Sequence, residues 1–337
     1  MAQRSPPKRR PWSWRSQAFR GLIYQAVAVG LVAAAVAYLT HNTLVNMAVR
    51  GIQSGFGFLA GPAGFDIGES VVPYAALDPY WKAFVVGILN TLRVAIAGIV
   101  GATLVGGLIG VGRFSRNAIV RGLCYAYVEV FRNVPVLLQL LMWYLIFVEV
   151  LPPVTEAIQV GHLFYLSKEG IAFPIPVWSD AAAMAWSIPV VDGFRIDGGA
   201  SATPEFMALL LGLVLYTAAY IAEVVRAGIS AVPHGQVEAA GSLGLSRRQA
   251  LRRVILPQAM RVIIPPMTSQ YLSVTKNSSL AVAIGYPDVV SIANTSLNQT
   301  GRAVECIAVI MAVYLATSLS ASGFMNWYNR RAAIRER

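Results

Sequence analysis

Long apolar runs, separated by shorter polar or basic segments, dominate the hydropathy pattern of this chain. The runs cover six segments, at about 21–39, 83–112, 123–148, 205–232, 258–285 and 304–328. An α-helix rises 1.5 Å per residue, so about 20 residues cross the roughly 30 Å hydrocarbon core of a bilayer. Hydrophobic residues make up 56% of the sequence. The pattern therefore predicts an all-α integral membrane protein with about six transmembrane helices.

The positive charge of the chain is concentrated in alternate segments. The formal net charge is +11, and Lys and Arg gather before the first run, between the second and third, between the fourth and fifth, and after the sixth. The other loops are acidic or balanced. Because cytoplasmic loops collect Lys and Arg, this alternation predicts cytoplasmic N and C termini. Orientation in a lipid bilayer thus explains the charge, and no nucleic-acid partner is expected.

The same alternation predicts how the chain is divided into regions. They are a cytoplasmic basic tail at 1–20, an extra N-terminal transmembrane helix at 21–40, a periplasmic loop at 41–82, a five-helix core at 83–328 and a cytoplasmic tail at 329–337. The core contains an outer insertion at 151–204 and a cytoplasmic loop at 233–257. Prolines at 174, 176 and 189 interrupt the apolar part of the insertion, which argues against a seventh crossing.

A cleaved signal peptide is the alternative for the first apolar run, because Ala33–Ala37 could pass for a cleavage site. The run is longer than the 7–15 apolar residues usual in a signal peptide. Six spans also require this run in order to leave the loop at 233–257 in the cytoplasm. The sequence therefore favours an uncleaved helix.

The loop at 233–257 is a polar and basic island between two apolar runs. It is predicted to form two short helices with a bend at Gly244, and Ser246 and Gln249 have the spacing of a capping box. Small residues beside Glu238 would let a partner surface approach closely. An amphipathic loop lying on anionic lipid is the alternative, although a lipid-facing helix needs no Glu, Ala, Gly and Pro at fixed offsets.

The spacing of this island closely resembles the EAA loop of permease subunits of ABC importers. In that family the loop forms the coupling helix that docks into a groove of the cytoplasmic ATPase subunit. The residues that carry the resemblance are Gly235, Glu238, Ala239, Ala240, Gly244, Leu256 and Pro257. The resemblance implies the type I permease fold of ABC importers, and it makes the region 83–328 the permease core.

Charged residues inside the third and fourth runs are candidates for a substrate path. Glu129 and Arg132 lie in the third run, ahead of a predicted kink at Pro135. Glu223 is expected near the middle of the membrane in the fourth run. Intramembrane charges are costly unless they pair or face water, so a substrate role and a structural Glu–Arg pair both stay open.

The segment Glu129–Pro135 looks like the Glu-x-Phe-Arg-x-x-Pro segment of polar amino-acid permeases. That branch of ABC importers serves histidine, glutamine, glutamate, arginine and related substrates. The outer insertion and the extra first helix resemble the longer, general L-amino-acid branch. The resemblance thus implies an amino acid as the substrate.

The fifth run is unusually polar, and Pro265 and Pro266 predict that its helix is broken. Lys276, Asn277 and Ser278 are candidates for the path, since freed backbone groups and a lysine suit the carboxylate of a zwitterion. The alternative is that Lys276 reaches the outer interface as a snorkelling side chain.

A stripe of small residues in the second run predicts close helix packing. Its members recur every four residues, as Gly98, Ala102, Gly106 and Gly110. Such a stripe lets another helix approach backbone to backbone.

Several motifs are absent from the sequence. None of the four lysines follows a glycine, so there is no phosphate-binding loop, and ATP and Mg are expected in a partner rather than as cofactors of this chain. Cys124 and Cys306 fall inside predicted spans, and the three histidines are scattered, so neither a disulfide nor a metal site is expected.

The sequence therefore predicts a non-catalytic permease that works by alternating access. The expected partners are an ATP-binding ABC subunit, a second homologous or identical permease subunit, a periplasmic amino-acid-binding protein and the amino acid itself. A self-contained secondary amino-acid transporter is the first alternative, disfavoured because no inverted repeat is evident. A membrane scaffold without transport is the second, disfavoured by the polar fifth run. An ABC permease for another small polar solute also stays open.

Overall fold

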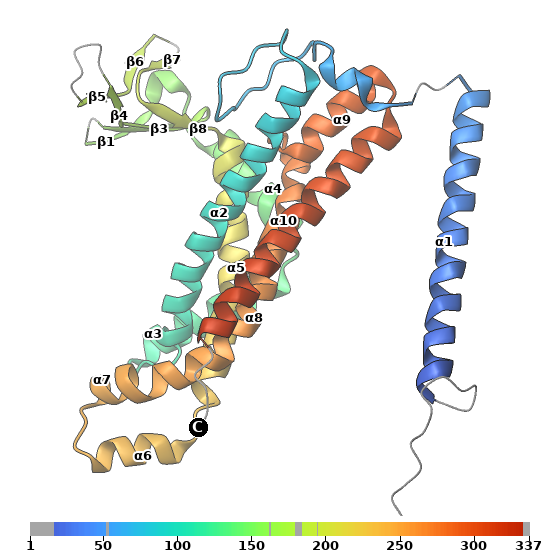
Figure 1. Ribbon diagram of the computed structural model, residues 1–337. Coiled ribbons are helices and arrows are strands. Elements are labelled where there is room, and N and C mark those ends of the chain that lie inside the picture. Colours follow the sequence, from blue (N-terminus) through green and yellow to red (C-terminus); the bar gives the residue numbers. More distant parts are fainter. Residues whose placement is uncertain (1–16, 52–53, 162, 179–183, 194, 333–337) are drawn as a thin grey trace, which may run out of the picture. The chain divides into compact units, whose positions relative to one another are not determined.

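A computed structural model describes residues 17–51, 54–161, 163–178, 184–193 and 195–332 (Figure 1). The chain forms two compact units, Met1–Gly55 and Phe56–Arg337. In the first unit, helix α1 runs over Gln17–Val49, about ten residues beyond the predicted end of the first run. It stops at Gly51, whose positive φ of 66° ends the helical path.

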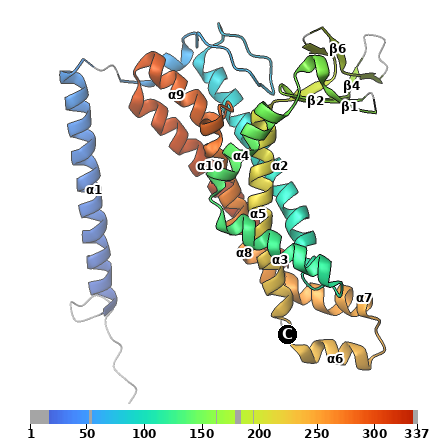
Figure 2. The same ribbon diagram turned by 180° about the vertical axis from the view of Figure 1, so that it is seen from behind.

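The second unit is a helical bundle with short helices at one end and strands at the other (Figure 1). Its long helices are α2 (Tyr80–Gly112), α5 (Pro204–Ser230), α8 (Leu256–Asn277) and α10 (Ala303–Ala332). Helix α2 packs along α5, which also contacts α8 and α4 (Val136–Leu145). Helix α3 (Ala118–Asn133) lies against α5 and contacts α2 (Figure 2). We call the end that carries the short helices α6 (His234–Ser242) and α7 (Arg247–Ala250) the inner end, and the end that carries the strands the outer end.

Among the described residues, four helices are long and apolar enough to cross a membrane, and two bent pairs bring the number to six if each pair is one span. This agrees with the predicted number of crossings. The pair of α3 with α4 and the π-turn Ile146–Val150 bends by 103°, far more than the predicted kink at Pro135. The break falls at Val134, because a residue before proline avoids the helical conformation.

The predicted break of the fifth span at Pro265 and Pro266 is wrong. Helix α8 continues through both prolines, whose side chains are exposed and therefore do not press on a neighbouring helix. The break comes later, where the 3₁₀ segment Ser278–Ile284 ends at Gly285 with φ 79°. A further helix, α9 (Val289–Thr300), follows and was not predicted, because its polar second half carries no hydrophobic signal.

Small residues bring α2 close to its neighbours along one face. Gly106 lies against the backbone of Ala218, because a Cβ atom added to it would come within 2.7 Å of the Ala218 carbonyl oxygen. Gly110 faces Val225 and Gly98 faces Val274, while the Ala102 side chain is fully buried. The stripe thus lies on α5 at its inner part and on α8 at its outer part.

The membrane part is all-α as predicted, but the outer insertion contains three antiparallel sheets. Strands β1 (Ile158–Val160), β2 (Phe164–Ser167), β3 (Gly170–Phe173) and β8 (Ala200–Ala202) form one sheet in that order. Hairpins are formed by β4 (Ile175–Trp178) with β5 (Met184–Ser187), and by β6 (Val190–Asp192) with β7 (Arg195–Asp197). The described part of the insertion has no seventh membrane helix.

Candidate coupling loop and translocation residues

The loop after α5 consists of two helices at an angle, as the sequence predicted. Three residues separate helix α6 (His234–Ser242) from α5, and α7 (Arg247–Ala250) leads through the π-turn Leu251–Ile255 into α8. Gly244 has a φ of 74°, and its N–H donates to the Gly241 carbonyl at 2.9 Å, which closes the end of α6. The predicted capping box is confirmed: the Ser246 N–H donates to Gln249 Oε1 at 2.9 Å, and the Gln249 N–H donates to Ser246 Oγ at 3.4 Å.

The surface of α6 is open. Glu238 and Ala239 are exposed, and a Cβ atom added to Gly235 would meet no atom within 4 Å. Ala240 is buried at 2% exposure and faces the returning segment. Leu256 is half-buried and Pro257 exposed at the start of α8. Apart from Ala240, this face is therefore available to a partner.

Two contacts tie the loop to the bundle. Ala231–Pro233 joins α6 directly to the inner end of α5, and Gln258 Nε2 on α8 donates to Gln236 Oε1 on α6 at 3.3 Å. The loop is thus held at both ends by helices that belong to the bundle, so a displacement of α6 moves the ends of α5 and α8.

Glu223 on α5 lies between two arginines. Its Oε2 is 2.5 Å from Arg113 Nη1, and its Oε1 accepts hydrogen bonds from Arg226 Nε at 3.0 Å and Nη2 at 2.5 Å. The Arg113 guanidinium also lies 4.1 Å from the ring centroid of Tyr125 on α3. Since Arg113 follows the last residue of α2, Glu223 is level with the inner end of α2 and not at the predicted mid-membrane depth.

The predicted path residues of α3 are both exposed. Arg132 lies 5.3 Å from the ring centroid of Tyr220 on α5, and Glu129 Oε2 is 3.5 Å from Asn133 Nδ2. Among the described residues Glu129 and Arg132 form no ion pair with each other. The structural Glu–Arg pair considered for this segment is therefore not formed, whereas Glu223 and Arg226 do form one.

The remaining path candidates lie where α8 ends. Lys276 is exposed, Asn277 is half-buried, and the buried Ser278 donates through Oγ to the Thr275 carbonyl at 2.7 Å. Within the described part of the chain, no hydrogen bond or ion pair joins Lys276 to Glu129 or Glu223. The candidates thus occupy three separate elements.

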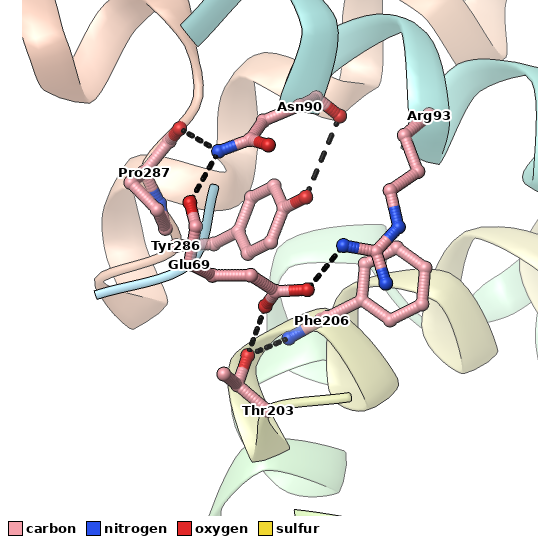
Figure 3. A network of polar contacts seen from close by, with 7 residues as sticks. All are labelled: Glu69, Asn90, Arg93, Thr203, Phe206, Tyr286 and Pro287. Atoms are coloured by element: carbon pink, nitrogen blue, oxygen red, sulfur yellow. Dashed lines mark hydrogen bonds and ion pairs between the residues drawn. The ribbon is translucent and has the colours of Figure 1, made fainter. Parts of the chain in front are cut away.

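Sequence reasoning missed a polar network at the outer end (Figure 3). The Glu69 carboxylate pairs with Arg93 Nη1 and accepts a hydrogen bond from Thr203 Oγ1 at 2.6 Å. Asn90 Nδ2 donates to the carbonyl oxygens of Glu69 at 2.8 Å and Pro287 at 2.9 Å. Glu69 lies in a Gly-rich loop to which no chemistry was assigned. The available signal was Arg93, a charge within an apolar run that needs a partner.

The described residues include no group of three or more side chains that could hold a metal ion. Cys124 and Cys306 are both free. The structure thus gives this chain a surface for a partner and several charged helix positions, and the described residues offer no ligand set for a metal.

Comparisons with known proteins agree with this architecture. The family described as "Binding-protein-dependent transport system inner membrane component" matches residues 102–334. The general L-amino acid transport system permease protein AapQ of Rhizobium johnstonii is 42% identical, over 97% of this chain and 96% of the relative. The putative amino-acid ABC transporter permease protein YhdX of Escherichia coli is 43% identical, over 96% and 97% of the two chains.

Solved structures give the same result for the fold. A chain from the crystal structure of an amino acid ABC transporter with histidines superposes with a TM-score of 0.55 at 26% identity, covering 75% of this chain and 95% of its own. The MetNI methionine ABC transporter matches the fold with a TM-score of 0.53 at 16% identity, over 75% and 97% of the chains. The chain therefore belongs to the inner-membrane components of binding-protein-dependent transport systems, and it is a multi-pass permease with the fold of ABC importer transmembrane subunits.

Proposed function

We propose that this chain is the transmembrane permease subunit of an ATP-driven amino-acid importer in the bacterial inner membrane, with both termini in the cytoplasm. One observation carries the coupling part of the proposal: Glu238 and Ala239 are exposed on a short helix fused to the inner end of α5. A helix held in this way transmits a push from a motor subunit to the bundle as rigid-body movement. The substrate class is supported by relatives that match nearly the whole chain and are named as amino-acid transport permeases.

The proposal requires partners. A separate ATP-binding subunit holds ATP and Mg and grips α6, and a periplasmic binding protein delivers the amino acid to the outer end. A second permease subunit, homologous or identical, completes the path. The exposed face of α8 supports this last partner, because Ser269, Ser273 and Lys276 follow one another at helical spacing and are all exposed. Polar groups facing hydrocarbon are costly, so such a face requires protein or water beside it.

The substrate path itself stays a proposal built from the charged helix positions. Lys276 and Asn277 supply donors for the carboxylate of a zwitterion, Ser278 lies next to them on the path, and Glu129 and Glu223 supply acceptors for the ammonium group. Arg132 is assigned to the same path. Alternating access would bring these elements into contact with the solute from one side at a time.

Charge reversal on α6 tests the coupling. We expect Glu238→Lys to abolish co-purification of the ATP-binding subunit while the permease stays folded in the membrane. Glu156→Lys is the matched control, because it makes the same charge change at an exposed position of the outer insertion. Retention of the ATP-binding subunit by the Glu238→Lys variant would contradict the coupling role.

A transport assay separates this function from a self-contained secondary transporter. We expect reconstituted vesicles to take up an amino acid only with the ATP-binding subunit, the binding protein and ATP. Competition with L-glutamate, L-glutamine and L-arginine then identifies the preferred charge of the substrate. Uptake by this chain alone without ATP would favour the secondary transporter.

A further inference from the structure

The outer end of the bundle contains a fully formed carboxylate site whose occupant is a side chain of this protein (Figure 3). One oxygen of Glu69 pairs with Arg93 Nη1, and the other accepts the hydroxyl hydrogen of Thr203 at 2.6 Å. The Glu69 side chain is 8% exposed and that of Arg93 is 32% exposed. An arginine and a hydroxyl directed at the two oxygens form a donor set that suits any carboxylate, not only that of Glu69.

The two donors are positioned independently of Glu69. Thr203 caps α5, where its Oγ1 accepts the N–H of Phe206 at 3.2 Å. The Arg93 guanidinium lies 4.0 Å from the centroid of the Phe206 ring, a cation–π contact that connects α2 with α5. These helices are packed together along most of their length. Phe206 thus contacts both donors, Thr203 through its N–H and Arg93 through its ring.

An open cavity of about 360 Å³ borders this site, which is within the size range of small-molecule pockets. Glu69 and Thr203 are part of its wall, together with the acidic residues Asp66 and Glu205 and with Ser291. Arg93 does not line the cavity, so Glu69 is the residue that both lines the cavity and pairs with the guanidinium.

We propose that Arg93 and Thr203 bind the α-carboxylate of an amino acid at the outer end, and that Glu69 occupies this site as an internal substitute until the amino acid displaces it. The ammonium group of the bound zwitterion then faces Glu205 and Asp66. Because Asn90 holds the main-chain carbonyl of Glu69 at 2.8 Å, displacement requires a rotation of the Glu69 side chain and not the release of its loop. The inference rests on the proposed function, since it takes the ligand to be an amino acid.

Variants of Glu69 and Arg93 test the proposal. Loss of the Glu69 charge should strengthen binding of the amino acid, whereas loss of the Arg93 charge should weaken it. The assay is equilibrium binding to the purified permease–ATPase complex in nanodiscs without the binding protein. The probe is whichever of L-glutamate, L-glutamine and L-arginine the wild-type complex imports best. We expect Glu69→Gln to lower the Kd at least about threefold. Arg93→Gln should raise it at least about tenfold, which corresponds to about 1.4 kcal/mol, and Arg93→Lys should restore part of the affinity.

The α-amide of the same amino acid provides a second readout. It should bind the wild-type complex and the Glu69→Gln variant at least about tenfold more weakly than the amino acid does, and the difference should vanish in Arg93→Gln. Two results would overturn the inference: equal weakening by Glu69→Gln and Arg93→Gln, as for an ion pair that only fastens the loop, or equal binding of amide and amino acid to the wild type. If the wild type imports one of the three amino acids and either result is obtained, only this inference is contradicted. If the wild type imports none of the three amino acids, the proposed function is contradicted.

Discussion

Arg113 Nη1 lies 2.5 Å from Glu223 Oε2, so an ion pair joins the inner end of α2 to α5. The Arg113 side chain is 4% exposed, while that of Glu223 is 27% exposed and also pairs with Arg226. Helix α6 begins at His234, eleven residues after Glu223, and α5 connects the two. The ion pair of Glu223 with Arg113 extends this connection from α6 to the end of α2. A displacement of the loop at 233–257 would therefore reach α2 as well as α5, the helix to which the loop is joined.

Substitutions of the two partners distinguish a path role of Glu223 from a structural one. Arg113→Gln removes one of the two arginines that pair with the Glu223 carboxylate, so we expect a loss of roughly 1–3 kcal/mol in the free energy of unfolding. Glu223→Gln should cause a similar loss and in addition lower the affinity or the rate of amino-acid uptake. Unfolding of the purified protein and uptake by reconstituted vesicles measure the two effects.

The control for this pair is Arg121→Gln, because the Arg121 side chain is exposed and its one hydrogen bond to the described residues is a long one, to the Ser115 carbonyl at 3.4 Å. It should change the free energy of unfolding by less than about 0.5 kcal/mol. Unchanged uptake by Glu223→Gln would remove Glu223 from the substrate path.

Helix packing gives a second prediction. A Cβ atom at Gly106 would lie 2.7 Å from the Ala218 carbonyl oxygen and from Ile221 Cβ, whereas one at Gly107 would meet no atom within 4 Å. Gly106→Ala should therefore separate α2 from α5 and cost roughly 1–3 kcal/mol, as overpacking does. The control is Gly107→Ala, at the next residue on the open side of α2, and it should be neutral or slightly stabilising. Thermal unfolding in detergent measures both, and equal stabilities would contradict the packing role.

The bend of the coupling loop gives a third prediction. Gly244 has a φ of 74°, a conformation that costs other residues about 1–2 kcal/mol. Gly244→Ala should displace α7 relative to α6 and reduce the ATPase activity that the binding protein stimulates in the assembled complex. The control is Gly241→Ala, at a helical position where a Cβ atom has free space. If both variants kept full stimulation, the left-handed bend would have no part in coupling.

The sequence was sufficient where a feature depends on neighbours along the chain. The spans, the bend at Gly244 and the Ser246–Gln249 capping box follow from hydropathy, glycine conformation and local hydrogen bonding, and the structure contains each of them. These features involve residues a few positions apart, whose geometry is fixed by the local backbone.

Features that depend on distant partners could not be derived in this way. Arg93 pairs with Glu69, 24 positions away, and Arg113 pairs with Glu223, 110 positions away. Such pairs depend on how helices cross, which hydropathy does not encode. The prolines of α8 misled for a related reason: a proline removes one backbone hydrogen bond, and whether the helix then breaks depends on the packing around it.

In the outer insertion, Phe173 is paired with Ala200 across β3 and β8. The chain thus leaves the first sheet after Phe173 and returns to it at Ala200, so that the segment 174–199 begins and ends at two paired strands. Changes in the length of this segment leave the pairing of β3 with β8 in place. A homologous importer can therefore lengthen, shorten or replace it to suit a different delivery protein without altering the register of any membrane helix.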